Sequence, residues 1–232
     1  MDQRRARPAS SHALRVYIVV VVVAGALVLA HSVVAAARTP QPLWWLALSG
    51  GVVLAGWFRL TFASVNATVG IEDTFLIATA LLFGPAPPTL AIAGSALLFS
   101  FRRGIPVRQI AFNAAALSLA VWASAWTFFA LAGVEPLALG HAPVARLALP
   151  LVALTLVYYV LNSGLTAVVV GLDTRQSPIQ IWRLHFQSLS INYLAAASLA
   201  CPAAFLALRG NLPLAAFRAA SPPAAFLENL AA

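Results

Sequence analysis

Long apolar runs, separated by short polar or proline-rich stretches, dominate the sequence. They cover residues 15–36, 42–60, 71–84, 88–101, 109–133, 147–172 and 188–208, with an ambiguous eighth run at 211–231. A helix that crosses a bilayer needs about 20 apolar residues, and most of these runs approach or exceed that length. The pattern therefore predicts an all-α fold, a polytopic transmembrane bundle of seven to eight helices.

Two of the runs, 71–84 and 88–101, are shorter than a full span. The sequence Gly84-Pro85-Ala86-Pro87-Pro88 separates them. Proline removes a backbone donor and ends helices, so we expect a Pro-broken pair of short helices at 71–101, joined by a tight turn inside or near the membrane. A single kinked helix is the alternative, which the density of prolines disfavours.

Composition excludes a soluble globular domain, because 62% of the 232 residues are hydrophobic, only 9% are charged, and the mean hydropathy is +0.90. The net charge of +8 and pI of 11.3 could indicate nucleic acid as a partner. Short arginine-bearing loops between apolar runs are instead typical of a membrane protein. We therefore expect the lipid bilayer as a partner, and no nucleic acid.

Arginine placement predicts the orientation, because cytoplasmic loops of membrane proteins carry an excess of basic residues. With the N-terminus in the cytoplasm, the cytoplasmic side receives Arg4, Arg5, Arg7, Arg15, Arg59, Arg102, Arg103, Arg108, Arg175 and Arg183, and the opposite side receives Arg38, Arg146 and Arg209. The richness in Ala, Arg, Pro and Gly is typical of a GC-rich bacterial genome. We expect a multi-pass protein of the bacterial cytoplasmic (inner) membrane.

The chain divides into a basic cytoplasmic N-terminus at 1–14, a transmembrane domain at 15–208 and a C-terminal segment at 209–232. The first apolar run is too long for the core of a signal peptide and is predicted to be a retained helix. The last segment is broken into short apolar pieces by Arg218, Pro222-Pro223 and Glu228. We expect this segment to be degenerate or truncated.

Glu72 and Asp73 are the only adjacent acids in the chain, and they precede the run Thr74–Phe83. At a helix N-terminus, acids cap backbone donors and favour the positive end of the helix dipole. That structural role is the simpler interpretation. A ligand contact or a proton- or cation-sensing pair at the mouth of a cavity is the alternative.

Asn113, Asn162 and Asn192 lie on three different apolar runs, and Tyr159 precedes Asn162 on the same helical face. Each asparagine is spaced so that it shares one helical face with small or weakly polar residues. Such a face favours close packing of helices and hydrogen bonds between them. A shared polar cavity that holds a small ligand is the second interpretation. Intramembrane polar groups are often functional, so both stay open.

Residues 173–187 mix arginines and glutamines with apolar residues that include Trp182 and Phe186. This mixture indicates a short interfacial helix on the cytoplasmic face. It could be an anchoring loop, or a lever that couples the bundle to another domain.

The sequence offers no signature of enzyme chemistry. It lacks a nucleophile–base–acid set, a glycine-rich phosphate loop and paired deep carboxylates, and Cys201 is its one cysteine. The histidines show no metal-ligand spacing. We predict a protein that is not an enzyme, with no cofactor and no metal.

Several short stretches follow one another along the chain in a characteristic order. They are Ile71-Glu72-Asp73-Thr74-Phe75 running into Leu81-Leu82-Phe83-Gly84-Pro85, then Phe112-Asn113-Ala114-Ala115, Tyr159-Val160-Leu161-Asn162-Ser163-Gly164-Leu165, a polar loop with Trp182-Arg183, and Asn192-Tyr193-Leu194-Ala195. Over about 40–205, this order resembles a bacterial membrane-associated sensor domain found N-terminal to GGDEF, HD-GYP or histidine-kinase modules.

This resemblance implies signal transduction, often cyclic di-GMP signalling, in response to an unknown small ligand or to the bilayer. The expected last span and output module do not follow Leu208, so we expect a sensor domain without its output, acting as a homodimer or with a signalling partner. The stretch Leu82-Phe83-Gly84-Pro85 is also similar to substrate-binding S-components of energy-coupling-factor transporters. A substrate-binding membrane subunit of a transporter is therefore the alternative.

Overall fold

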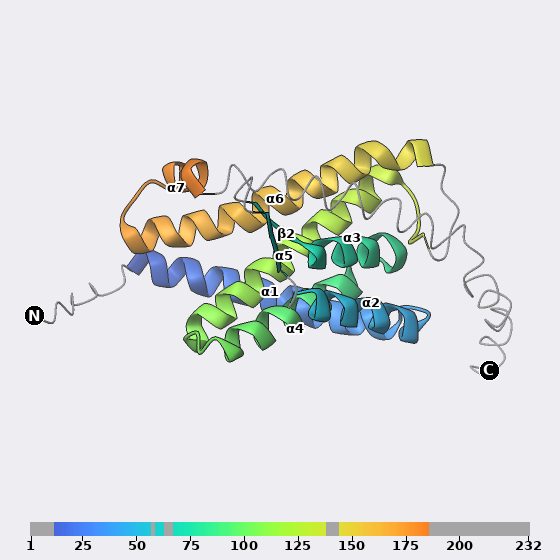
Figure 1. The fold of residues 1–232 in the computed structure, drawn as a ribbon, viewed down its shortest axis with the longest axis horizontal. Helices are drawn as coiled ribbons and strands as arrows, with labels where there is room; N and C mark the ends of the chain where they lie inside the picture. Colours follow the sequence, from blue (N-terminus) through green and yellow to red (C-terminus); the bar gives the residue numbers. More distant parts are fainter. Residues whose placement is uncertain (1–11, 57–58, 63–66, 138–143, 186–232) are drawn as a thin grey trace, which may run out of the picture.

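The computed structural model describes residues 12–56, 59–62, 67–137 and 144–185. The elements follow in the order α1 (His12–Ala37), α2 (Pro42–Ala55), β1 (Arg59–Phe62), β2 (Ala67–Gly70), α3 (Ile71–Phe83), α4 (Ala86–Arg102), α5 (Val107–Ala132), α6 (Val144–Thr174) and α7 (Pro178–His185) (Figure 1). The predicted run 188–208 with Asn192, the segment 209–232 and residues 1–11 lie outside this part of the chain.

Three of the described helices are long and apolar enough to cross a membrane, namely α1, α5 and α6. Apolar side chains on their outer faces are exposed, among them Leu27 at 68% and Leu149 at 75%. Lipid tails are as apolar as leucine, so such a surface matches a bilayer. The helical fold class is thereby confirmed within the described residues, whereas a bundle of seven or eight crossings stays a prediction.

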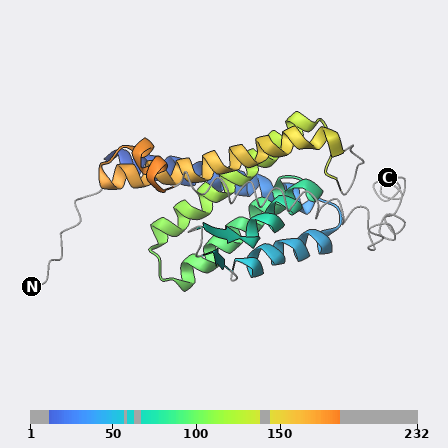
Figure 2. The same cartoon turned by 45° about the horizontal axis from the view of Figure 1, so that its top comes forward.

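The long helix α5 runs through the centre of the bundle and packs on α1, α4 and α6 (Figures 1 and 2). Helices α2, α3 and α4 pack on one another as a second group beside it. Because α5 touches both groups, its two faces join the long helices to the short ones.

Three clusters of buried apolar side chains follow one another along α5. The proximal cluster, near the start of α5, contains Leu14, Ile18, Val21, Phe112, Ala115 and Ala116. The middle cluster contains Val52, Leu76, Ala91, Ile92, Ala120, Val121 and Tyr158. The distal cluster contains Ile77, Leu81, Leu82, Phe83, Phe128, Leu137, Leu147 and Leu154. Since α5 contributes to all three in sequence order, the clusters mark three levels of the bundle.

Helices α2 and α3 reach only from the distal level to the middle one. Trp44 and Trp45, at the start of α2, pack on the distal cluster, and Val52 belongs to the middle cluster. α3 runs back, with Leu76 in the middle cluster and Leu81 in the distal one. With 14 and 13 residues, each is about 20 Å long, which is short of the bilayer core of about 30 Å.

The expected crossing over 42–60 therefore differs from the structure. α2 ends at Ala55, and Arg59 begins β1 rather than following a complete span to the cytoplasmic side. β1 and β2 pair antiparallel, with Arg59 opposite Gly70 and Phe62 opposite Ala67. This short hairpin, which the apolar pattern did not predict, joins the inner ends of the two half-length helices.

A break between α3 and α4 confirms the predicted pair of short helices at 71–101. Gly84 makes the turn with a φ of 87°, a conformation that glycine adopts without steric cost. Pro87 and Pro88 were expected to precede the second helix, but they lie in its first turn. Proline is tolerated there because the first N–H groups of a helix have no partner within it.

The short helix expected within 173–187 is α7 (Pro178–His185), which folds back against α6, whereas its place at the membrane interface stays a prediction. The reversal follows Thr174, where Arg175 takes a positive φ of 59°. The indole Nε1 of Trp182 then donates a 2.8 Å hydrogen bond to Ser163 Oγ, and its ring lies 5.7 Å from that of Tyr159. A helix with one strongly apolar face can pack in this way as readily as it can lie on a membrane.

Candidate functional site

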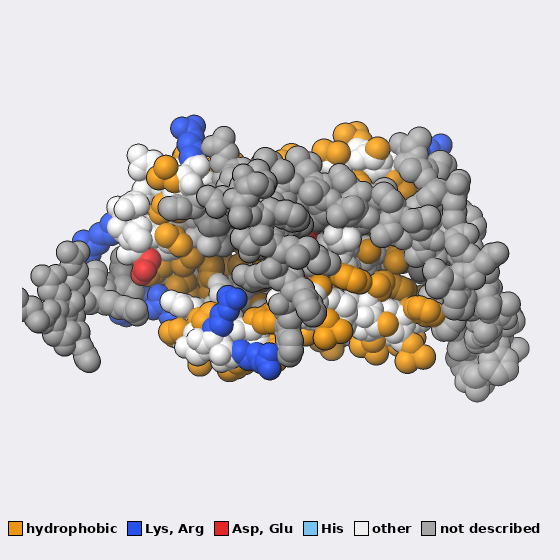
Figure 3. Space-filling model, viewed as in Figure 1, with side chains coloured by type: hydrophobic (Ala, Val, Ile, Leu, Met, Phe, Trp, Pro, Cys, Tyr) orange, Lys and Arg blue, Asp and Glu red, His pale blue; other side chains and the backbone are white. Residues whose placement is uncertain are grey.

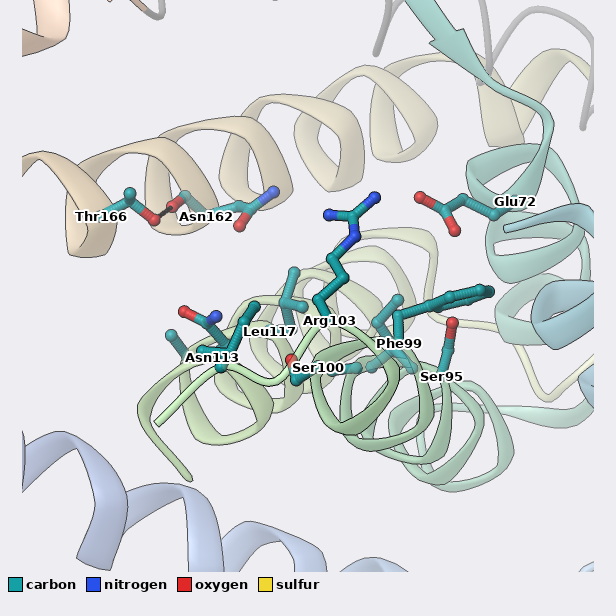
Figure 4. A pocket seen from close by; sticks show the side chains of 13 residues that line it. Glu72, Ser95, Phe99, Ser100, Arg103, Asn113, Leu117, Asn162 and Thr166 are labelled. Atoms are coloured by element: carbon teal, nitrogen blue, oxygen red, sulfur yellow. Dashed lines mark hydrogen bonds between the residues drawn. The ribbon is translucent and has the colours of Figure 1, made fainter. Parts of the chain in front are cut away.

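A cavity of about 210 Å³ lies between the start of α3 and helices α4, α5 and α6 (Figure 4). Its walls are formed by Glu72, Ile92, Ser95, Ala96, Phe99, Ser100, Arg103, Ile105, Asn113, Ala116, Leu117, Asn162 and Thr166. An acid, a base, two amides and three hydroxyls thus line one cavity in an otherwise apolar bundle.

The half-length of α3 explains where this cavity forms. Glu72 lies in the first turn of α3, at the middle level of the bundle. Asn113 and Thr166 are next in sequence to Phe112 and Leu165, which belong to or pack on the proximal cluster. The cavity therefore extends from the start of α3 toward the proximal level, into the part of the bundle that α3 does not reach.

Helix α4 supplies the longest wall of the cavity. Its lining side chains lie at positions 92, 95 and 96, and 99 and 100, and Arg103 follows directly after the last helical residue, so that successive groups are three or four positions apart. In a helix of 3.6 residues per turn, this spacing places them on one face. Helix α4 thus carries a stripe that changes from apolar at its centre to cationic at its C-terminal end.

The structure brings together two of the three predicted asparagines. Asn113 on α5 and Asn162 on α6 line the same cavity, with Thr166 one turn beyond Asn162. The Thr166 hydroxyl donates a 3.0 Å hydrogen bond to the backbone oxygen of Asn162 (Figure 4). Asn192, the third, lies outside the described residues.

Glu72 also lines the cavity, and Arg103 faces it from α4. Figure 4 shows the Arg103 guanidinium directed into the space between the Glu72 carboxylate and the Asn162 amide. The described lining residues therefore carry one negative and one positive charge. The Glu72 side chain is half-buried and the Arg103 side chain is exposed, so solvent weakens the attraction between these two charges.

Gly56, at the end of α2, lies against two of the side chains that line this cavity. A Cβ atom at this position would lie 2.6 Å from Glu72 Oε2 and 2.6 Å from Phe99 Cε2. The backbone at the end of α2 thus lies so close to these two lining side chains that a residue with a Cβ atom would collide with them. Glycine at this position leaves room for Glu72 and Phe99 where they stand.

Asp73, the second predicted acid, has a different partner. Its carboxylate accepts a 3.1 Å hydrogen bond from the hydroxyl of Tyr158 on α6. Tyr158 is buried in the middle cluster. Asp73 therefore ties the start of α3 to the middle of α6 and does not belong to the cavity lining.

Tyr159, which the sequence predicted to share a ligand site with Asn162, contacts Trp182 of α7 instead. Its ring packs on Trp182, and its backbone oxygen accepts a 2.5 Å hydrogen bond from Ser163 Oγ. It is buried at the contact between α6 and α7. The cavity lining does not include it, and the tyrosine that reaches the acidic pair is Tyr158.

Sequence reasoning missed the contributions of α4, above all Arg103. In the sequence, this arginine is explained as a cytoplasmic charge that sets orientation. The spacing of Ser95, Phe99 and Ser100 before it was the signal that could have indicated a polar face. Within the described residues, no group of three or more His, Cys, Asp or Glu side chains gathers at a metal-binding distance.

No family model matches the chain, and neither the curated proteins nor the solved structures include a match. The likeness to bacterial sensor domains therefore depends on the residues quoted for it. What the site can do has to be argued from the cavity itself.

Proposed function

We propose that this chain is an integral membrane sensory domain that binds a small polar ligand in the cavity between α3, α4, α5 and α6. The observation that carries the proposal is the convergence of Glu72, Arg103, Asn113 and Asn162 on one cavity. Ligand sites combine apolar walls with a few polar groups that fix orientation, and this cavity has both.

One turn of α6, which contains Asn162 and Ser163, connects the cavity to α7. Asn162 lines the cavity, and the next residue, Ser163, accepts the hydrogen bond from Trp182 of α7. A ligand that shifts this turn of α6 also shifts the docking position of α7. We propose that α7 transmits the occupied state to a signalling partner, a second copy or an output module of the kind the resemblance implies.

The distribution of charge supports a bacterial inner-membrane protein with its proximal end in the cytoplasm. Arg103, Arg108 and Arg175 lie at helix ends near the proximal level, whereas Arg38 and Arg146 lie at distal ends. Figure 3 shows most of the visible basic side chains over one half of the molecule. This excess of basic residues near the proximal level matches the excess of arginine and lysine in the cytoplasmic loops of membrane proteins.

A second candidate function is a substrate-binding membrane subunit of a transporter. The half-length helices α2 and α3 favour it, because many transporters bind substrates at helices that are interrupted near the membrane midplane. Glu72 lies at one such interruption.

Ligand binding can be tested with the full chain in lipid nanodiscs and the dialysable small-molecule fraction of a bacterial extract. A bound ligand stabilises the native state by mass action, so this fraction should raise the Tm of the unmodified protein. Asn162→Leu should abolish that increase. Gln109→Leu, which changes an exposed polar residue of α5 outside the lining, should retain it.

Asn113→Leu gives a second variant at an exposed position, in case Asn162→Leu fails to fold. If the extract never raises the Tm, or raises it equally in every variant, the proposed function is rejected. Proteins that co-purify with the chain separate the two candidates: a transporter subunit should bring down an energising partner, and a sensor should dimerise or bring down a signalling protein.

A further inference from the structure

We infer that the turn between α4 and α5 binds the headgroup of an anionic phospholipid, with the lipid phosphate beside Arg102 and Arg108. The inference goes beyond the proposed function, because neither arginine lines the cavity and the ligand is a component of the bilayer itself. It is carried by the level of the turn in the membrane, by its charge and by the apolar side chains that are exposed beside the arginines.

The turn lies at the level of the lipid headgroups. Helix α5 begins at Val107 and is one of the described helices that are long and apolar enough to cross a membrane. Its 26 residues make it about 39 Å long, whereas the hydrocarbon core is about 30 Å thick. The first residues of α5 therefore extend beyond the hydrocarbon, into the layer that holds the lipid phosphates.

Backbone hydrogen bonds give this turn a defined shape. Gly104 takes a φ of 63°, and its N–H donates a 3.1 Å hydrogen bond to the backbone oxygen of Phe101. The N–H of Ile105 donates a 3.2 Å hydrogen bond to the backbone oxygen of Ser100. Two such bonds around a left-handed glycine form the Schellman motif, which ends a helix. The backbone of the turn is therefore ordered before a lipid binds, which lowers the entropic cost of binding.

The turn carries an excess of positive charge. Arg102, Arg103 and Arg108 all have exposed side chains, and the sequence contains no Asp or Glu over residues 74–134. The Arg103 guanidinium is directed into the cavity that Glu72 also lines (Figure 4), so the two other arginines supply the charge for a ligand outside it. A guanidinium binds a phosphate through paired N–H donors.

Exposed apolar side chains next to these arginines favour a lipid over a soluble anion. Phe101, which precedes Arg102, is 64% exposed, and Val107, which precedes Arg108, is 73% exposed. Figure 3 shows basic and apolar side chains next to one another in the region where Figure 1 places the end of α4 and the start of α5.

This combination matches the boundary between headgroups and acyl chains. Apolar side chains at that boundary contact the acyl chains, while the long arginine side chains reach the headgroups. A free phosphate ion would gain nothing from Phe101 and Val107. A phospholipid offers a phosphate and two acyl chains at once.

Headgroup selectivity tests the inference. The full chain is placed in nanodiscs that contain equal amounts of phosphatidylglycerol and phosphatidylcholine with the same acyl chains, and native mass spectrometry counts the lipids that stay bound. Both lipids carry a phosphate, but phosphatidylcholine adds a cationic group and has no net charge. We expect phosphatidylglycerol to be retained in at least about fivefold excess, the ratio that one basic residue near an anionic lipid surface supplies. Equal retention of the two lipids overturns the inference.

Substitution of the two arginines should remove this selectivity. The double variant Arg102→Gln/Arg108→Gln should retain the two lipids in a ratio close to one. Arg108→Gln alone should lower the ratio part of the way, and it keeps the test decisive if the double variant fails to fold.

Arg38→Gln/Arg146→Gln is the matched control, because it removes two exposed arginines near the distal ends of the long helices. It should keep the excess of phosphatidylglycerol. If both double variants lose the selectivity equally, it depends on the net charge of the chain and not on this turn, and the inference is overturned.

An excess of inorganic phosphate separates a lipid from a soluble anion. Compared with sodium chloride of the same ionic strength, it should not displace phosphatidylglycerol from the unmodified chain. Displacement would assign the two arginines to a soluble phosphate compound and overturn the inference. Because neither arginine lines the cavity, this test and the Tm test with the bacterial extract can fail independently.

Discussion

The Tyr158 hydroxyl, halfway along α6, donates a 3.1 Å hydrogen bond to the Asp73 carboxylate in the first turn of α3. The bond fixes the level at which α3 begins. It thereby fixes Glu72, the neighbouring residue, at the edge of the cavity. A hydrogen bond outside the cavity thus positions Glu72, one of the charged residues that line it.

We expect Tyr158→Phe and Asp73→Asn to be coupled in a double-mutant cycle. Interhelical hydrogen bonds in membranes contribute about 0.6 kcal/mol on average and about 1.7 kcal/mol at most. The coupling free energy should fall in that range. Reversible unfolding in mixed micelles measures it.

Tyr17→Phe provides the comparison for this cycle. The Tyr17 hydroxyl donates a 3.1 Å hydrogen bond to the backbone oxygen of Leu165, on a different pair of helices. Its effect should add to that of Asp73→Asn within about 0.5 kcal/mol, as for independent sites. Equal coupling of Asp73 to both tyrosines would contradict a specific bond to Tyr158.

Gly56→Ala should weaken ligand binding and lower the Tm. The backbone at Gly56 has φ −61° and ψ −15°, which alanine adopts freely. The effect therefore comes from contact alone, because the new Cβ would lie 2.6 Å from Glu72 Oε2 and 2.6 Å from Phe99 Cε2. Overpacking of this kind costs about 1–3 kcal/mol. Thermal unfolding with and without the bacterial extract measures both effects.

Gly50→Ala is the matched control on the same helix, where nothing lies within 4 Å of the added Cβ. Alanine is favoured over glycine inside a helix by about 0.5–1 kcal/mol, so this variant should be neutral or more stable. A Gly56→Ala protein that binds and unfolds like Gly50→Ala would show that the cavity wall does not depend on Gly56.

The long helices could be predicted closely from sequence. α5 was expected at 109–133 and covers Val107–Ala132, and α6 was expected at 147–172 and covers Val144–Thr174. Lipid offers no hydrogen-bond partner to the backbone, so a long apolar run has few alternatives to a helix. Local composition is then sufficient to place it.

The half-length of α2 could not be predicted in this way, because residues 42–60 are apolar almost throughout. Close packing of Gly56 on Glu72 and Phe99 accompanies the end of the helix. These contacts join residues that are distant in sequence. Composition along the chain carries no information about them.

The candidate site was predictable where a polar residue interrupts an apolar helix, as Asn113 and Asn162 do. It was not predictable at Arg103, since arginine near a helix end already has a topological explanation. Nor could the sequence choose between Tyr158 and Tyr159. Neighbouring residues on a helix point about 100° apart, and only the packing of α3 and α7 decides which one meets the acid.

Ser163→Ala should loosen α7 without unfolding the bundle. The substitution removes the acceptor of the 2.8 Å bond from Trp182 Nε1 but keeps the ring contact with Tyr159. A net loss of about 1 kcal/mol should speed amide hydrogen exchange over Pro178–His185 by about fivefold. Ser118→Ala is the control, because the Ser118 hydroxyl donates to Ala114 of its own helix. Equal exchange in both variants would contradict docking of α7 through Ser163.

Gly25→Ala should separate α1 from α5. The added Cβ would lie 2.5 Å from the Cβ of Ala115, 2.6 Å from its Cα and 3.0 Å from its carbonyl oxygen. Backbone atoms cannot move aside as a side chain can, so the two helices have to part, which weakens the proximal cluster between them. We expect a loss of about 1–3 kcal/mol, measured as a lower Tm.

A second-site change distinguishes this backbone contact from a simple clash of side chains. Ala115→Gly removes the Cβ at 2.5 Å but leaves the Cα and the oxygen, so it should restore only part of the stability lost in Gly25→Ala. Gly164→Ala, where nothing lies within 4 Å, should cause no loss. Full rescue by Ala115→Gly would show that the two backbones are not in contact. A partial rescue supports α1 and α5 as a pair of helices whose backbones are in contact at Gly25 and Ala115.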